Sequence, residues 1–84
     1  MEWKEYDWNG NLIFEGEYLN DERNGKGKEY NENEKLKFDG EYYNNYRIKG
    51  KEYIMRKLVY EGEYLYDKKY NGKDMMKMVI LYMN

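Results

Sequence analysis

The sequence predicts an all-β protein, an antiparallel meander of about three β-hairpin repeats in an elongated, twisted, single-layer sheet. The first observation behind this prediction is a phrase of aromatic, acid, glycine, acid and tyrosine, whose glycine stands at positions 16, 40 and 62. The second is a Gly-Lys-Glu-Tyr phrase at 27–30 and 50–53, which returns as Gly-Lys-Asp-Met at 72–75. A period of about 23 residues is typical of repeat arrays, in which each unit buries its apolar face against its neighbours.

The first phrase has the alternation of a β-strand. From Phe14 to Tyr18, the aromatics and the glycine would share one face of a strand, and the two acids between them would share the other. A helix would scatter the aromatics around its surface. The copies at 36–42 and 58–64 keep the same alternation and are rich in the aromatics that strands favour, so we predict a strand at each copy.

The second phrase supplies the partner strands, at 26–30 and 49–53, and a related strand is expected at 4–8. Asn9-Gly10 follows this first strand and predicts a type I′ hairpin turn, because both residue types tolerate positive φ. The equivalent turns further along lack the glycine, so we expect other geometries there. Polar connections that carry the insertions and deletions are expected on the opposite side of the array, at 19–25, 43–48 and 65–71.

A glycine in the middle of each first-phrase strand needs a reason, because glycine there costs about 0.5–1 kcal/mol relative to alanine. We expect an aromatic ring from the neighbouring unit to lie over the bare main chain at Gly16, Gly40 and Gly62. The alternative is a β-bulge that only increases the local twist. An aromatic two residues to each side of every such glycine favours the first interpretation.

The composition excludes most kinds of catalysis. The chain has no cysteine, histidine, serine or threonine, so it lacks the usual nucleophiles and any side chain whose ordinary pKa is near neutral. Zinc, copper and haem sites normally need imidazole or thiolate ligands. We therefore predict that the protein is not an enzyme and that it holds no cofactor and no metal.

Charge and hydropathy point to a small protein of the cytoplasm. The net charge is −2 with acids and bases interspersed, which gives no overall attraction to nucleic acid. The longest apolar run, 78–83, is far too short to span a bilayer, and the N-terminus has no apolar stretch of the signal-peptide kind. We expect a cytoplasmic protein, and association with a membrane surface is left as an alternative.

The repeated residues resemble the MORN (membrane occupation and recognition nexus) repeat, whose pattern is aromatic-x-Gly-x-aromatic, a variable turn, Gly-x-Gly and a closing aromatic. The first unit has every one of these residues, including Gly25. The second has Ile48 in place of one glycine, and the third has Tyr70 and Met75 in place of a glycine and the closing aromatic. The motif positions in this chain are Phe14, Gly16, Tyr18, Gly27, Tyr30, Phe38, Gly40, Tyr42, Gly50, Tyr53, Tyr60, Gly62, Tyr64 and Gly72.

The resemblance covers about residues 4–75, and the Lys-Glu-Tyr and Asn-Gly-Asn-Leu elements are similar to the bacterial MORN-variant branch. It implies an elongated sheet of hairpins with roles in protein association, membrane-proximal scaffolding and phospholipid contact. In the bacterial variant branch it also implies neutralisation of a toxin. The eroded glycines of the second and third units make the C-terminal half less regular than the first.

The chain is expected to form a single repeat domain over 1–84. We divide it into an opening hairpin at 4–27, further repeats at 28–50 and 51–72, and an atypical C-terminal segment at 73–84. The methionine-rich end of this last segment fits either a capping strand or short helix, or an apolar edge that associates with another copy. The sequence does not separate the two roles.

Charged residues should lie on the face opposite the aromatics. The acids expected there are Glu15, Glu17, Asp39, Glu41, Glu61 and Glu63. They would form either a surface for a cation or a basic partner, or a solvated face whose acids pair with lysines across the strands, which we favour. A basic stripe could contact anionic lipid or an acidic partner through Lys26, Lys28, Lys49, Lys51 and Lys73, together with Arg23, Arg47, Lys68 and Lys69.

Exposed aromatic and apolar side chains are candidate anchors for an interface. The residues predicted for this role are Trp8, Tyr46, Met78, Ile80 and Tyr82, and Trp3, Tyr43, Tyr66 and Tyr70 are further aromatics expected to be exposed and suited to it. For Trp8 and Tyr46 the alternative is that the rings cover glycines and belong to the core. The sequence thus predicts a non-catalytic repeat scaffold for protein–protein association, self-association as a homodimer included. Binding of anionic phospholipids and an antitoxin-like neutralising role are the alternatives.

Overall fold

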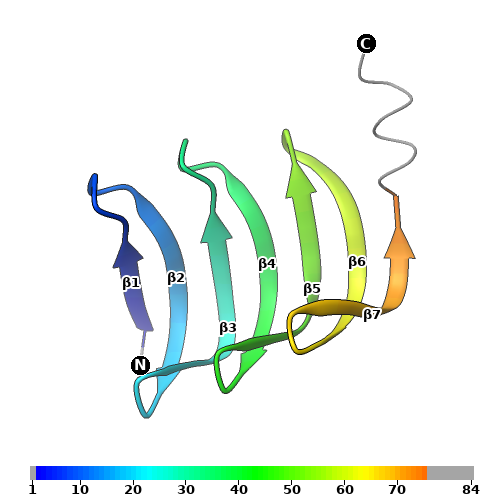
Figure 1. Cartoon of the computed structure of the whole chain (residues 1–84), viewed down its shortest axis with the longest axis horizontal. Helices are drawn as coiled ribbons and strands as arrows, with labels where there is room; N and C mark the ends of the chain where they lie inside the picture. Colours follow the sequence, from blue (N-terminus) through cyan, green and yellow to red (C-terminus); the bar gives the residue numbers. More distant parts are fainter. Residues whose placement is uncertain (1, 76–84) are drawn as a thin grey trace.

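The computed structural model describes residues 2–75, which form one seven-stranded antiparallel sheet in which every strand pairs with the next along the chain (Figure 1). This confirms the predicted all-β meander of hairpins. The sheet is a single layer, and the molecule measures 41 × 31 × 15 Å. The strands are β1 (Glu2–Tyr6), β2 (Leu12–Leu19), β3 (Glu22–Tyr30), β4 (Leu36–Tyr43), β5 (Tyr46–Ile54), β6 (Lys57–Leu65) and β7 (Lys68–Asp74).

The polar connections predicted on one side of the array are wrong, because β3, β5 and β7 begin earlier than expected. Each connection shrinks to a two-residue turn in which both residues have positive φ, as in a type I′ turn. The first is Asn20-Asp21, with φ of +52° and +64°. Asn and Asp tolerate this backbone region better than other non-glycine residues, and they occupy five of the six positions in these turns, Asn20, Asp21, Asn44, Asn45 and Asp67.

The type I′ turn predicted at Asn9-Gly10 is also wrong, since only Gly10 has positive φ (+82°). The connection is a five-residue loop in which the Asp7 carboxylate accepts the amide protons of Asn9 and Asn11, both at 2.9 Å. The loop at 31–35 repeats this arrangement without a glycine, with Asn31 in the place of Asp7 and Glu34 (φ +57°) in the place of Gly10. The side-chain bonds of the first residue therefore fix this geometry.

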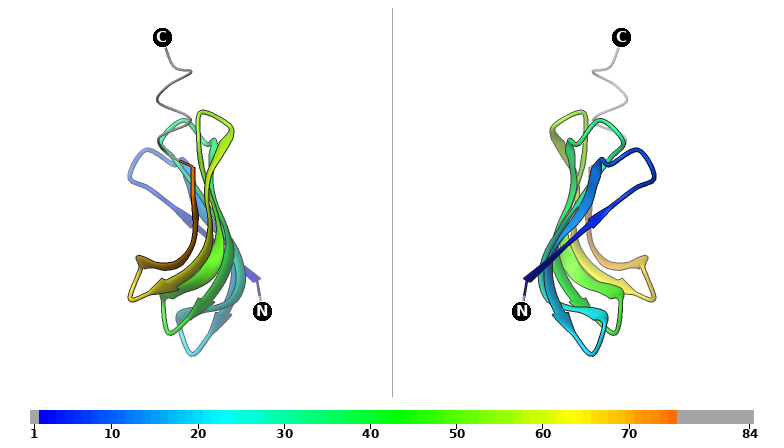
Figure 2. Two further views of the ribbon diagram at one scale, coloured as in Figure 1. Left: turned by 90° about the vertical axis from the view of Figure 1, so that its right-hand side faces the viewer. Right: turned by 90° about the vertical axis from the view of Figure 1, so that its left-hand side faces the viewer.

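A row of glycines crosses the curved sheet, whose profile is visible in Figure 2. Strand register aligns Gly16, Gly27, Gly40, Gly50, Gly62 and Gly72 from β2 to β7. A Cβ atom on Gly40 would lie 2.2 Å from the carbonyl oxygen of Lys49 and 2.7 Å from the Cα of Gly50. Neighbouring main chains thus approach too closely at this row for any side chain, and such rows allow a sheet to curve.

Aromatic rings lie over the glycine row, as predicted, but most of them come from a different place than expected. The Phe14 ring lies 2.9 Å from the Cβ position of Gly16 and 2.7 Å from that of Gly27, and Phe38 covers Gly40 and Gly50 in the same way. Each ring thus covers the glycine two residues later in its own strand, because side chains in strands lean along the strand. At the three glycines of the prediction, Gly16, Gly40 and Gly62, the nearest ring thus comes from the same strand and not from a neighbouring unit, whereas Tyr42 of the next unit lies 3.0 Å from the Gly27 position.

Candidate functional site

The concave face of the sheet carries a continuous chain of aromatic rings. Successive ring centroids are between 5.3 and 5.9 Å apart, a spacing at which aromatic pairs attract one another. Five of these rings form the buried core, with Tyr18 packed against it. The chain runs through Trp3, Tyr18, Phe14, Tyr42, Phe38, Tyr64 and Tyr60.

Each repeat adds a glutamate and a basic residue to two of these rings, and we call such a set a cassette. The basic side chains lie over ring faces, Arg23 at 4.1 Å from the centroid of Phe14 and Arg47 at 4.3 Å from that of Phe38. The sets are cassette 1 (Glu5, Phe14, Tyr18, Arg23), cassette 2 (Glu29, Phe38, Tyr42, Arg47) and cassette 3 (Glu52, Tyr60, Tyr64, Lys69).

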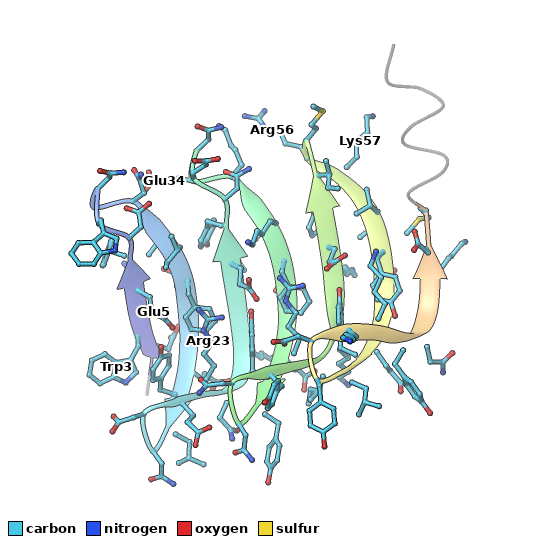
Figure 3. The ribbon with its side chains drawn as sticks, in the orientation of Figure 1. Trp3, Glu5, Arg23, Glu34, Arg56 and Lys57 are labelled. Atoms are coloured by element: carbon cyan, nitrogen blue, oxygen red, sulfur yellow. The ribbon has the colours of Figure 1, made fainter. Side chains whose placement is uncertain are left out.

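Cassettes 1 and 2 share a forked hydrogen-bond geometry between arginine and glutamate. Arg23 donates to both carboxylate oxygens of Glu5 at 3.0 Å, and Figure 3 shows the two side chains together on the concave face. Arg47 donates to both oxygens of Glu29 at 2.9 Å, and its third nitrogen donates to Glu52 at 2.8 Å. Bidentate pairs of this kind are strong, so Arg47 is firmly held within cassette 2, and its single bond to Glu52 joins that cassette to cassette 3.

Tyrosine hydroxyls complete the first two cassettes and fix their charge states. Tyr18 donates to Glu5, and Tyr42 donates to Glu29. Burial alone would raise the pKa of Glu29, but the hydrogen bonds from Arg47 and Tyr42 outweigh it and hold the pKa below its usual value. The pKa of Glu5 is lowered in the same way. Burial and the bond to Glu29 raise the pKa of Tyr42, so this hydroxyl remains a donor.

Cassette 3 has the same plan with weaker contacts. Lys69 lies 5.1 Å from the centroid of Tyr60, and its amino group is 3.5 Å from the Glu52 carboxylate. The buried hydroxyl of Tyr64 makes no hydrogen bond with any residue in the described part of the chain. Burial and the charge of Glu52 raise the pKa of Tyr64. A point-charge lysine cannot reproduce the fork of an arginine, so this cassette is more loosely connected.

The sequence interpretation missed the cassettes, and the residues that it grouped into one basic stripe are divided between the two faces of the sheet. Arg23, Arg47 and Lys69 lie over rings on the concave face, whereas the five lysines of the stripe belong to the charged rows of the opposite face. A partial signal was present, because Arg23 and Arg47 each precede the glutamate of a Lys-Glu-Tyr element in the same strand. It was hidden because a bulge lies between the two positions and breaks the period-two pattern.

The outer face bears two rows of alternating charge. Cross-strand register confirms the predicted pairing of acids with lysines, and Glu41 lies 3.4 Å from Lys49. One row runs through Lys4, Glu15, Lys28, Asp39, Lys51, Glu61 and Lys73, and the other through Lys26, Glu41, Lys49 and Glu63. Glu17, beside the second row, accepts the amide proton of Lys26 at 2.7 Å. In residues 2–75 no cluster of three or more acids is arranged to hold a metal ion.

The three two-residue turns line up at one end of the strands (Figure 1). Exposed apolar side chains gather there, and we call this surface the turn edge. Its apolar members are Leu19, Tyr43, Tyr46, Leu65 and Tyr66, and all of them are exposed. Tyr46 and Tyr66 belong to different turns, yet their ring centroids are 5.3 Å apart in an edge-to-face contact. Tyr66 is 69% exposed. The turn edge is thus the largest set of large exposed apolar side chains at one edge of the described sheet.

Hydrogen bonds between successive units hold the turns of this edge in place. The Asn45 side chain accepts the amide proton of Arg23 at 2.7 Å, and the Asn45 amide donates to the Arg23 carbonyl at 3.0 Å. Asp67 repeats the first of these bonds with the amide of Arg47, at 2.8 Å. The same arginines are fixed by their cassettes, so the exposed side chains stand on turns tied to the core.

The predicted interface residues do not form one surface. Tyr46 lies in the turn edge, and Trp8 lies in the loop at the opposite end of the strands, where it is fully exposed. Trp8 therefore covers no glycine, and the core alternative for this residue is wrong. The other three predicted residues, Met78, Ile80 and Tyr82, lie outside the described residues, as does most of the predicted C-terminal capping segment.

Comparison with known proteins gives no family assignment: no protein-family model, no curated protein and no solved structure matches the chain. The likeness to MORN repeats consequently rests on the spaced glycines and aromatics alone. Within residues 2–75 there is no helix with the length and apolar character needed to cross a membrane.

Proposed function

We propose that this protein is a non-catalytic β-repeat scaffold that binds another protein through the turn edge. The observation that carries the proposal is the set of exposed tyrosines and leucines on three turns, of which the second and third are hydrogen-bonded to the strand that follows the preceding turn. Tyrosine is enriched among the residues that dominate binding energy, and a surface that is already rigid loses little entropy on binding. Tyr46 and Tyr66, in contact across two turns, would form the centre of the surface.

The arrangement of the acids also favours binding over catalysis. A general acid needs a carboxyl group with a raised pKa. The carboxylates of Glu5 and Glu29 are instead held in the charged form by arginine and tyrosine. Their hydrogen-bonding capacity is directed at the neighbouring strands, which makes the concave face a structural element of the scaffold.

The proposal is tested by quantitative affinity capture with matched variants. Wild-type protein, a Tyr46→Ser/Tyr66→Ser variant and a Trp8→Ser control would each be immobilised and used to capture proteins from the source cells. We expect at least one protein to bind wild type and the Trp8 control and to be lost with the double variant, and we expect its binding to be reproduced with purified components. Captured proteins that are insensitive to the double substitution would contradict a role for the turn edge.

Binding of anionic phospholipids is a second candidate, because a basic and apolar tip stands on the opposite edge. Met55 is 71% exposed at the β5–β6 turn, beside Arg56 and Lys57 (Figure 3). Within residues 2–75 neither of these two basic side chains forms an ion pair, and Lys35 and Lys37 at the start of β4 are equally unpaired. Each basic residue near an anionic membrane contributes about 1 kcal/mol.

Sedimentation with phosphatidylserine vesicles at low salt separates this candidate from protein binding. Lipid binding at the tip requires co-sedimentation that is lost on Arg56→Glu and Lys57→Glu substitution and retained in the Tyr46→Ser/Tyr66→Ser variant. Absence of wild-type protein from the vesicle pellet would remove the candidate.

A further inference from the structure

Successive repeats are linked by a recurring contact, in which a side chain of one unit accepts a main-chain amide proton of the unit before it. At the turn edge, Asn45 and Asp67 make this contact with the amides of two arginines. At the opposite end of the strands, the Glu34 carboxylate accepts the amide proton of Leu12, the first residue of β2, at 2.8 Å. Each bond satisfies a donor near the start of a strand and ties two units together.

The next contact in this series is broken by a change of charge. Leu36 begins β4 as Leu12 begins β2. Arg56 stands in the place of Glu34, at the same distance before the glycine of the first phrase, and both residues have positive φ, +65° and +57°. An arginine side chain has no acceptor, so it cannot receive the Leu36 amide proton. Within residues 2–75, the carboxylate found at Leu12 therefore has no counterpart at Leu36.

A hollow of about 350 Å³ lies where this carboxylate is missing, and we call it the Leu36 hollow. Its lining residues are Glu34, Lys35, Leu36, Tyr53 and Arg56, and Figure 3 shows Glu34 and Arg56 at the same end of the strands. Lys35 and Arg56 are exposed, and neither forms an ion pair in the described part of the chain. The Glu34 carboxylate is already bonded to the amide of the preceding unit. The hollow thus combines two cations with the start of a strand.

We propose that the Leu36 hollow binds the carboxylate of a glutamate or aspartate side chain of another protein. The carboxylate would take the place that Glu34 occupies beside Leu12, with one oxygen accepting the Leu36 amide proton. Lys35 and Arg56 would donate to the same group, and hydrogen bonds from cationic side chains to a carboxylate are about twice as strong as neutral ones. The inference goes beyond the proposed function, because the hollow and the turn edge lie at opposite ends of the strands.

The neighbouring unit identifies a carboxylate as the group that fits. The Glu34 side chain reaches the Leu12 amide from a turn of the next unit, so the partner would supply from outside what the chain supplies to itself one repeat earlier. The lysines of the outer face differ from this site, because acids stand opposite them in the neighbouring strands. Lys35 and Arg56 face a main-chain donor instead, which leaves their charge available to an acidic partner.

The test is an amide NMR titration of the full chain at low salt with a blocked peptide, acetyl-Gly-Glu-Gly-amide. We expect the amide signal of Leu36 to shift saturably. The peptide acetyl-Gly-Gln-Gly-amide has nearly the same shape without the charge and should leave this signal in place. Arg56→Gln should weaken binding of the glutamate peptide about fivefold or more. Lys57→Gln is the matched control, because it removes a neighbouring charge that does not line the hollow.

Arg56→Glu supplies the missing carboxylate from within the chain. The introduced side chain should accept the Leu36 amide proton as Glu34 accepts that of Leu12. The Leu36 signal of this variant should therefore lie downfield of its wild-type position before any peptide is added, and it should no longer respond to the peptide. Circular dichroism verifies that each variant is folded.

Two results overturn the inference: a Leu36 signal that the glutamate peptide does not move, or one that the glutamine peptide moves equally. Inorganic phosphate replaces the peptide in a parallel titration. A saturable shift of Leu36 with phosphate and none with the glutamate peptide would assign the hollow to a phosphate group, and it would also overturn the proposal. The Tyr46→Ser/Tyr66→Ser variant should bind the glutamate peptide as wild type does, so a failure of the proposed function at the turn edge is recognised separately by affinity capture.

Discussion

Cassettes 2 and 3 follow the same plan with one decisive difference, arginine in the first and lysine in the second. Arg47 makes three hydrogen bonds of 2.8–2.9 Å to two glutamates while its guanidinium covers the Phe38 ring. Lys69 reaches Glu52 and Asp74 only at 3.5 and 3.6 Å. The sequence phrases of the two repeats are nearly identical, yet their side chains hold the neighbouring strands together with different strength.

The comparison shows where the stability of a single-layer sheet comes from. A sheet without a second layer cannot bury its ring row completely, and here the basic side chains act as its cover. The planar guanidinium covers a ring and pairs with carboxylates in the same plane, whereas an ammonium group does so less well. We therefore expect the free energy of local unfolding to be highest for β3–β5 and lowest for β6–β7.

The largest effect is expected for Phe38→Ala in cassette 2. The Phe38 ring is fully buried, lies over Gly40 and Gly50, and contacts two tyrosines as well as Arg47. Its loss should cost about 3–5 kcal/mol of unfolding free energy, measured by urea denaturation. Tyr60→Ala in cassette 3 should cost less, because within residues 2–75 that ring has a single aromatic neighbour. Equal losses would contradict the difference between the cassettes.

Arg47→Lys should make cassette 2 resemble cassette 3. The substitution keeps the charge and removes the fork to Glu29, so we expect a loss of about 1.5–3 kcal/mol in unfolding free energy. Arg56→Lys at the exposed β5–β6 turn is the control and should leave stability unchanged. If the two substitutions have the same effect on urea denaturation, the fork does not hold the repeats together.

The acid stability of the protein should depend on the glutamates paired with arginine. Because the pKa of Glu29 in the folded protein lies below its usual 4.5, the unfolded chain takes up the proton first. The unfolding free energy should therefore fall as the pH drops below about 4.5 towards the lower folded-state pKa. Glu29→Gln removes this contribution. In urea denaturation measured at a series of pH values, the unfolding free energy of this variant should fall less steeply on acidification than that of wild type. An equally steep fall of the unfolding free energy in the variant and in wild type would contradict the pairing of Glu29 with arginine.

The smallest effect is expected on the outer face. Lys49 and Glu41 are 3.4 Å apart but largely exposed to water, and exposed pairs contribute about 0–1 kcal/mol. Lys49→Ala should accordingly change the urea midpoint little, and added salt should change it little as well. A loss comparable to that of Arg47→Lys would show that the outer rows, and not the cassettes, hold the sheet.

Much of the scaffold was predictable because its signals are local. The period-two alternation around each glycine placed β2, β4 and β6, and it also placed acids and lysines opposite one another on the outer face. The aromatics two residues away predicted that rings cover the glycines, but not that each ring belongs to the same strand as its glycine. The turns were harder, because Glu34 adopts a conformation that favours glycine once Asn31 has fixed the loop.

The cassettes and the turn edge could not be predicted from local pattern. Arg23 bonds to Glu5, which is 18 residues away in the chain, and it does so only because the bulge in β3 turns its side chain over Phe14. The alignment of Tyr46 with Tyr66 depends on the relative offset of two hairpins. Both features are set by register across several strands, which no single segment specifies.

The central claim is that arginine-containing cassettes hold the repeats together and that the lysine cassette holds them less well. Amide hydrogen exchange measured by NMR on wild type and on Lys69→Arg tests it most directly. We predict slower exchange in β4 and β5 than in β6. The difference in exchange rate should be smaller in Lys69→Arg, because arginine can form a bidentate pair with Glu52. Equal protection of these strands in wild type, or a difference unchanged by Lys69→Arg, would contradict the claim.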